Sequence, residues 1–191
     1  MKIMKLFRAP AVCFGIMTIL CGIVYTSAVT GAAQLLFPQQ ANGSMITATQ
    51  KDGSQKEYGS EWIAQEFTKP QYLIGRPSGI SNLSPVGKEQ RELVTERISR
   101  WHSLDPDNEA DIPMDLVTAS GSGADPHISP DAAEYQVARI AAARNITEDQ
   151  VRSMIRAYTK GRFLGFIGQP SVNVLQVNLA LDGLLKPEKV V

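Results

Sequence analysis

The side chains that most often bind metals or act as general bases are sparse in this chain. Its two histidines, His102 and His127, are 25 residues apart, and both cysteines lie within the first 21 residues. Zinc sites place His and Cys ligands at short, regular spacings, and this sequence has no such spacing. We therefore expect both histidines to be exposed and structurally incidental.

Four acidic residues alternate along one polar stretch, as at the start of a calcium-binding loop: Asp105, Asp107, Glu109 and Asp111. A calcium loop of this type has glycine at its sixth position and glutamate at its twelfth. The corresponding positions hold Ala110 and Leu116. The pattern therefore indicates an acidic, solvated surface loop rather than a calcium site.

The segment 119–127, ASGSGADPH, places serine, aspartate and histidine close together in the chain. A nucleophile elbow of the form G-x-S-x-G needs glycine two residues before and two residues after the serine. Neither Ser120 nor Ser122 has glycine at these positions. The segment is therefore interpreted as a flexible Gly/Ser turn rather than as part of a catalytic triad.

The segment 161–169, GRFLGFIGQ, has glycines at positions 161, 165 and 168. It lacks the Lys-Ser/Thr pair of a phosphate-binding P-loop, so it does not indicate a nucleotide site. With the preceding patterns also excluded, we expect no catalytic residue, no metal site and no cofactor site belonging to this chain.

The N-terminal stretch is the most informative part of the sequence. Lys2, Lys5 and Arg8 are the only charged residues before Lys51. A helix that crosses ~30 Å of hydrocarbon needs about 20 apolar residues, and this uncharged stretch provides them. We predict a cytoplasmic tail over residues 1–8, a transmembrane helix with its external end over 9–36, and an extracytoplasmic domain over 37–191.

A cleaved signal peptide is the competing interpretation of this stretch. The apolar core of a signal peptide usually has about 7–15 residues, and the run from Ala9 to Tyr25, broken only by Thr18, is longer. Small residues around Ala33 resemble a cleavage site, so this alternative stays open. Because all the nearby basic residues precede the helix, we expect the N-terminus to face the cytoplasm.

Small residues are spaced four apart near the external end of the predicted helix, in two pairs: Ser27 with Gly31, and Ala28 with Ala32. Such spacing puts both members of a pair on one face of a helix and lets a second helix approach closely in lipid. These four residues are the predicted partner-binding surface. Small residues are also common in membrane helices that face lipid, so that alternative remains.

Composition limits what the remaining part can bind. Removing the three N-terminal basic residues from a total of 19 leaves 16, against 19 acidic residues. This weak negative balance, without a basic stripe, excludes nucleic acid as an expected partner. Both cysteines fall in the predicted anchor, so we expect no disulfide in the external domain.

Local signals predict a mixed α+β domain after the anchor. Asp52-Gly53 is a turn signal between two short strands, and residues 59–85 indicate a loop. We expect a helix capped by Ser84 and running to Trp101, a strand over 114–120, and a helix from Pro130 to Arg144 capped by Ser129. Two further helices are expected to follow Thr147 and Asn173, each with glutamine three residues later.

Several segments together resemble the C subunit of the Kdp-type potassium-transporting ATPase. They occur in the family's order and spacing and cover most of the chain from Phe37 to Leu184: FPQQANGSMI, GSEWIAQEFTKPQYLIGRPSG, SNLSP, VTASGSGADPHISPDAAEYQVARIAAARNI and IGQPSVNVLQVNLALD. The second segment is similar to the family signature that ends in Y-x-x-G-R-P-S. The acidic stretch around Asp107 and the linker around Asp52 match poorly.

The resemblance implies a single-pass accessory subunit of the bacterial inner membrane with a periplasmic domain. Its implied partners are a potassium-channel-like subunit and a P-type ATPase subunit, which handle potassium and ATP. It also implies a role in assembly and, as a catalytic chaperone, in raising the ATP affinity of the ATPase subunit. The expected orientation argues against direct ATP contact, because ATP is cytoplasmic.

Two function classes compete with an accessory subunit. One is a membrane-anchored extracytoplasmic hydrolase, which would need a convergent nucleophile and base that the sequence does not indicate. The other is a ligand-binding module resembling a lipoprotein. No cysteine sits at the end of the apolar stretch, which argues against lipid attachment.

Overall fold

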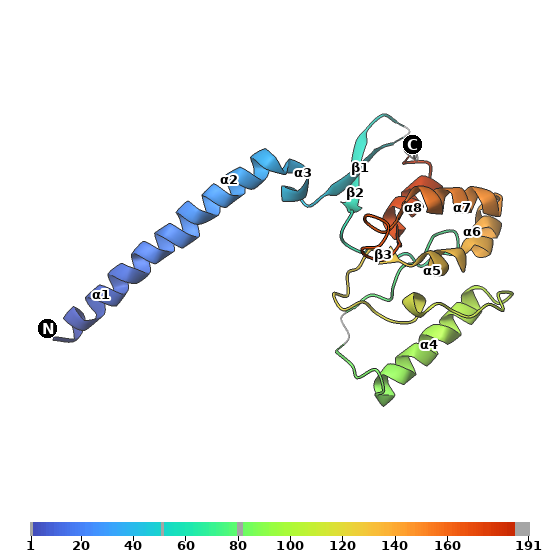
Figure 1. The fold of residues 1–191 in the computed structure, drawn as a ribbon, viewed down its shortest axis with the longest axis horizontal. Helices are drawn as coiled ribbons and strands as arrows, with labels where there is room; N and C mark the ends of the chain where they lie inside the picture. The colour runs from blue at the N-terminus through green and yellow to red at the C-terminus, as the bar shows by residue number, and fades with distance from the viewer. Residues whose placement is uncertain (1, 51, 80–81, 186–191) are drawn as a thin grey trace. The chain divides into compact units, whose positions relative to one another are not determined.

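The computed structural model describes residues 2–50, 52–79 and 82–185, with side chains from Phe7 onward. The chain divides into two compact units, Met1–Met45 and Ile46–Val191, and each is described by itself. One long apolar helix accounts for most of the first unit, whereas the second combines short strands with helices (Figure 1). The predicted fold class, one N-terminal apolar helix followed by a small mixed domain, is confirmed.

The first unit is a continuous helical rod built from three successive segments (Figure 1): α1 Lys2–Met17, the π-helical η1 Thr18–Tyr25 and α2 Thr26–Leu36. Within this rod, Phe7–Leu36 forms a 30-residue stretch with a mean hydropathy of 2.1, long and apolar enough to cross a membrane. The backbone leaves helical geometry at Phe37 (φ −138°), and Pro38 starts the short helix α3 Pro38–Ala41. The rod therefore ends at Leu36, and the division into tail, membrane helix and external domain stays a prediction.

Strands form two small sheets. β1 Met45–Thr49 and β2 Gln55–Ser60 pair across the predicted Asp52-Gly53 turn, where Gly53 has φ +85°. The second sheet has the order β3-β5-β4, with β3 His127–Ile128, β5 Ser171–Asn173 and β4 Thr159–Lys160. Both of its pairings are antiparallel, and Val172 at its centre lies opposite Ile128 and Thr159.

The second unit contains one long helix and several short ones: α4 Lys88–Leu104, the 3-10 turn η2 Met114–Leu116, α5 Pro130–Glu134, α6 Val137–Arg144, α7 Glu148–Ala157 and α8 Val174–Leu181. Three predicted caps are confirmed. Ser129 accepts from the Ala132 amide, Thr147 and Gln150 form a reciprocal capping box, and Asn173 accepts from the Gln176 amide.

Three expectations were wrong. Gly87, not Ser84, precedes α4, and the Ser84 carbonyl instead accepts from the Gly87 amide in a turn. Residues 114–120 form the turn η2 and a loop rather than a strand. The helix from Pro130 is interrupted at Tyr135 and Gln136, where the Tyr135 carbonyl accepts from the Asn108 side chain instead of from a helical amide.

The apolar core of the second unit collects residues from helices, β-strands and loops. Trp101 of α4 packs edge-on against Tyr135, with 5.7 Å between ring centroids, and its indole N–H donates to the Leu116 carbonyl at 3.0 Å. The largest fully buried apolar side chains are Leu73, Leu116, Ile128, Val137, Ile140, Val151, Val172 and Val177. Because most come from short elements, the core depends on contacts between segments distant in sequence.

An irregular segment, residues 70–74, runs through this core without a strand partner among the described residues. Leu73 is fully buried, and both of its backbone groups bond to the Asn178 amide, at 2.8 and 2.9 Å. Ile74 makes the same two-bond arrangement with the Gln136 amide, at 2.8 and 3.0 Å. Side-chain amides, each with a donor and an acceptor, thus replace the neighbouring strand that would normally satisfy a buried backbone.

Replacing Asn178 with Leu tests this arrangement. The substitution keeps the number and branching of the side-chain heavy atoms but leaves the buried N–H and C=O of Leu73 without partners. We expect a loss of roughly 3 kcal/mol in unfolding free energy, because an unsatisfied buried polar group costs about 1–3 kcal/mol. The measurement is denaturant unfolding of the full chain in detergent, followed by tryptophan fluorescence. The control Gln176→Ala, partly exposed on the same helix, should change stability by about 0.5 kcal/mol or less.

Candidate functional site

The four predicted partner-binding residues lie on α2 of the apolar rod. Ser27, Ala28, Gly31 and Ala32 are all exposed in this chain. Their i, i+4 spacing gives two adjacent small-residue pairs on neighbouring strips of the helix surface. A Cβ atom added at Gly31 would meet nothing within 4 Å, so a larger side chain there does not disturb the subunit itself. Any effect of such a change must therefore come from outside this chain.

The helical rod has a widened segment just before these residues. The π-helix η1 covers Thr18–Tyr25, and the Thr26 hydroxyl donates to the Cys21 carbonyl at 3.0 Å. Hydroxyl donors of this kind satisfy carbonyls that the altered helical register leaves available. Every side chain from Phe7 to Leu36 is exposed except the partly exposed Gly15 and Ala33. The rod thus presents its whole circumference to its surroundings.

Two arginines donate hydrogen bonds to the backbone carbonyls of residues 70–72, which lie in the segment that resembles the family signature (the signature segment, residues 59–79). Arg139 is buried and donates to the carbonyls of Pro70 and Tyr72 and to the Gln136 side chain. Burial lowers the pKa of the Arg139 guanidinium to about 10, so the side chain remains charged at neutral pH. The charge lies over the Trp101 ring, 5.7 Å from its centroid, a cation–π arrangement.

Arg144 joins the same segment to the C-terminal helix α8. It donates to the Gln71 and Leu181 carbonyls and pairs with Asp182 at 2.7 Å. The Tyr72 hydroxyl donates to the other oxygen of Asp182 at 3.1 Å. Burial, together with the neighbouring carboxylate, raises the pKa of Tyr72, so it remains a donor at physiological pH.

Charged residues converge where the G-R-P-S motif meets the two loops that carry Asp115 and Asp125. Arg76 pairs with Asp115, whose second oxygen accepts from the Ser129 amide at 2.7 Å. The Arg76 Nε lies 3.6 Å from Asp125. Asp115 therefore links the signature segment to the start of α5, and the set is a structural junction between three loops.

His127 is half-buried, so the expectation of an exposed residue was wrong for it. Its Nδ1 lies 3.4 Å from Asp125, its Nε2 lies 3.5 Å from the Asn173 amide, and its ring centroid is 6.0 Å from that of Trp62. His102, in contrast, is exposed on α4 as predicted. The partial burial of His127 could not be predicted locally. It follows from the pairing of His127 in β3 with Asn173 in β5, which only the tertiary fold creates.

The Ser-Asp-His segment does not have the geometry of a nucleophilic triad. The Ser120 hydroxyl lies 3.3 Å from that of Ser122 and 3.4 Å from the Asp125 amide nitrogen, within the turn. A triad places the serine on the far nitrogen of the histidine, and here that nitrogen is next to the Asn173 amide. The residues form the predicted Gly/Ser turn.

The acidic stretch lines an open hollow of about 660 Å³ beside α5 and α6. Asn108 is tied into this wall by its bonds to Asp105 and to the Tyr135 carbonyl, and Arg139 and Arg152 supply positive charge on the other side. Within the described residues, no group of three or more His, Cys, Asp or Glu side chains is arranged to hold a metal ion. The stretch functions here as a loop that covers the break between α5 and α6.

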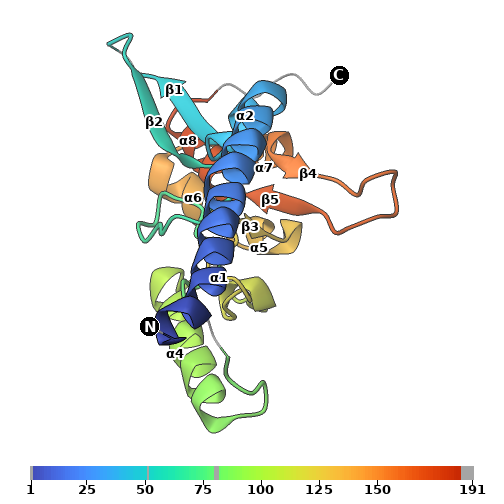
Figure 2. The same cartoon turned by 90° about the vertical axis from the view of Figure 1, so that its left-hand side faces the viewer.

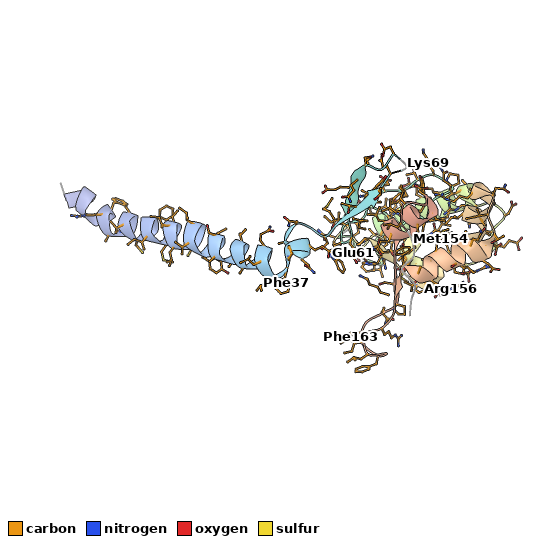
Figure 3. All side chains as sticks on the ribbon, turned by 90° about the horizontal axis from the view of Figure 1, so that it is seen from above. Phe37, Glu61, Lys69, Met154, Arg156 and Phe163 are labelled. Carbon is orange, nitrogen blue, oxygen red and sulfur yellow. The ribbon has the colours of Figure 1, made fainter. Side chains whose placement is uncertain are left out.

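The glycine-rich segment 161–169 has a property that the sequence analysis missed. It projects from the strands β4 and β5 as an arm, with Phe163 at its far end (Figures 2 and 3). Four large apolar side chains on this arm are 50–72% exposed: Phe163, Leu164, Phe166 and Ile167. The run FLGFI between polar residues was the available signal, but it was weighed only as a phosphate loop.

Comparison with known proteins settles the family. The family model described as "KdpC: K+-transporting ATPase, c chain" matches residues 7–183. The chain belongs to the KdpC family. The resemblance predicted from Phe37 to Leu184 is thereby confirmed, and the matched residues also include the apolar helix. The chain is a subunit of a potassium-transporting ATPase.

Individual KdpC relatives are similar along their whole length. A protein of Listeria monocytogenes serotype 4a, named "Potassium-transporting ATPase KdpC subunit", is 50% identical over 96% of this chain and 98% of its own. Proteins of the same name from Clostridium perfringens and Methylococcus capsulatus are 48% and 45% identical, covering 96% and 93% of this chain. One candidate membrane helix among the described residues is consistent with a membrane subunit of this family.

Proposed function

We propose that this chain is a non-catalytic subunit of an ATP-driven potassium uptake complex, needed for the assembly and stability of that complex. The observation that carries the proposal is full-length similarity to KdpC subunits. The partners we propose are a potassium-channel-like subunit and a P-type ATPase subunit. Large exposed apolar areas on the rod and on the arm support a role in binding other proteins rather than in turnover.

We further propose that the rod spans the inner membrane once, with residues 1–8 in the cytoplasm and residues 37–191 in the periplasm. The three basic residues before the rod and the absence of charge up to Lys51 support this orientation. In this arrangement the chain raises the ATP affinity of its partner, as the family resemblance implies, without touching ATP. The effect must then pass through membrane helices or through the external domain.

The orientation predicts a specific protease pattern. Protease added to spheroplasts should digest residues 37–191 and leave a short protected fragment that contains the apolar rod. Alkaline carbonate should leave the chain in the membrane, because about 20 or more apolar residues hold a helix in the bilayer. Full protection of the external domain would reverse the orientation, and a mature N-terminus near Ala33 would show a cleaved signal peptide instead.

The non-catalytic role predicts that the purified chain releases no phosphate from ATP above a no-protein control. The sequence has neither a P-loop nor the D-K-T-G phosphorylation motif of P-type ATPases, so turnover requires the partner. Deleting the chain should lower recovery of the other subunits as a complex. ATP turnover that co-purifies with this chain after removal of every partner subunit would contradict the proposal, as would full assembly without it.

The small-residue face of α2 predicts a defect in Gly31→Leu. In lipid, helices associate by close packing, and a leucine would hold the partner helix away from Ser27, Ala28 and Ala32. Contacts of ~1–2 kcal/mol are at stake, so we expect roughly tenfold lower recovery of the assembled complex. The control Leu20→Ile changes shape, not size, elsewhere on the rod. Equal recovery of both variants would mean that this face meets lipid.

A further inference from the structure

The arm between β4 and β5 is a hydrogen-bonded turn that displays apolar side chains; we call residues 161–169 the apolar finger. Phe163 and Ile167 pair across it as an isolated antiparallel bridge, with bonds of 2.8 and 2.9 Å in the two directions. The amides of Gly165 and Phe166 bond to the carbonyls of Arg162 and Phe163, at 3.1 and 3.3 Å. The finger therefore holds its tip in one defined shape.

Leu164 sits at the tip in a left-handed backbone conformation. Its φ is +51°, followed by Gly165 at +81°. Glycine adopts this region freely, whereas a branched apolar residue does so rarely and at an energetic cost. Leu164 is also 69% exposed, so packing within this chain does not compensate for the strain. A strained, exposed leucine is favoured where its side chain is used by something outside the chain.

A lipid surface is the less suitable occupant for the finger. Segments that bind anionic lipid carry clusters of basic residues, and segments at the bilayer interface favour tryptophan and tyrosine. The finger itself carries one charge, Arg162, and neither tryptophan nor tyrosine. The nearby Lys160 is bound to Glu61 at 2.6 Å and lies over the Trp62 ring. Lys160 is therefore engaged within the chain.

A protein pocket fits these features better. Two phenylalanines beside a leucine and an isoleucine are anchor side chains of the kind that fill central pockets of interfaces, and a fixed shape reduces the entropy lost on binding. Arg162 bonds only to the Gln169 amide, at 3.4 Å, among the contacts described for its side chain, and it forms none of the described salt bridges. A carboxylate at the rim of the receiving pocket would complement it.

We propose that the apolar finger inserts into an apolar pocket, rimmed by a carboxylate, on the external face of another subunit of the same potassium-transporting complex. This inference rests on the proposed function, because it requires the chain to be a subunit of that complex. The finger would then position the external domain against its partner independently of the small-residue face of the membrane helix.

The first experiment changes the finger without touching the core. Phe163→Ser combined with Phe166→Ser should lower recovery of the tagged complex from detergent by at least tenfold while leaving the unfolding midpoint of the isolated chain unchanged. The matched control is Val86→Ser combined with Met114→Ser, which removes two apolar side chains that are 78% and 74% exposed. Wild-type recovery of the finger variant would overturn the proposal.

Leu164→Asn separates binding from local structure. Asparagine tolerates the left-handed conformation better than leucine, so the turn should persist and the isolated chain should be no less stable. If the finger docks, recovery of the complex should still fall severalfold, because the apolar tip is lost. Unchanged recovery would mean that Leu164 has no partner. Arg162→Glu should weaken recovery more than Arg162→Lys if a carboxylate rims the pocket.

A polarity-sensitive thiol dye distinguishes the possible occupants. Leu164→Cys would be labelled in a Cys13→Ser, Cys21→Ser background and measured in nanodiscs of phosphatidylglycerol and phosphatidylethanolamine. A blue shift in the assembled complex, absent for the chain alone, is the expected result. A shift for the chain alone would identify lipid as the occupant and overturn the proposal.

Different results would contradict the finger inference and the proposed subunit role. If finger variants assemble normally while deletion of the whole chain still abolishes the complex, the finger inference is wrong and the subunit role stands. If deletion of the chain leaves the complex intact, the subunit role itself fails.

Discussion

Hydrogen bonding of the backbone in the irregular segment 70–74, whose Leu73 is fully buried, is the constraint on which the second unit depends. Buried N–H and C=O groups must find partners, and among the residues that the structure describes no strand of the two small sheets lies beside this segment. Gln136 and Asn178 supply paired donor and acceptor atoms, and two arginines take the remaining carbonyls. The helices α6 and α8 therefore share the apolar core and are also both hydrogen-bonded to the same irregular segment.

The local elements of this fold were predictable, whereas its long-range polar contacts were not. The helix starts at Ser129, Thr147 and Asn173 follow from capping chemistry, which acts over three residues. Residues 114–120 were predicted to form a strand, but Leu116 is buried in the apolar core, where its carbonyl accepts from the Trp101 indole. The roles of Gln136 and Asn178 depend on residues 62 and 105 positions away, beyond any local pattern.

Of the two proposed binding surfaces, only one was visible in the sequence. Small residues spaced by four on an apolar helix indicate a face directly, because helix periodicity alone brings Gly31 and Ser27 together. The apolar finger could not be recognised in this way. A run such as FLGFI more often signals a buried strand, and its exposure is decided by where β4 and β5 place it in the fold.

The bond between Leu73 and Asn178 also has a consequence for biosynthesis. The two residues are separated by 105 positions, and Asn178 lies close to the end of the described chain. Contacts between distant positions form late, because the chain between them must first be closed into a loop. In the orientation proposed above, the second unit crosses the membrane from its N-terminal end, and its core would close only after nearly the whole polypeptide had been translocated. In that orientation, a translocation that stalled before Asn178 had crossed would leave Leu73 without its partner and the core incomplete.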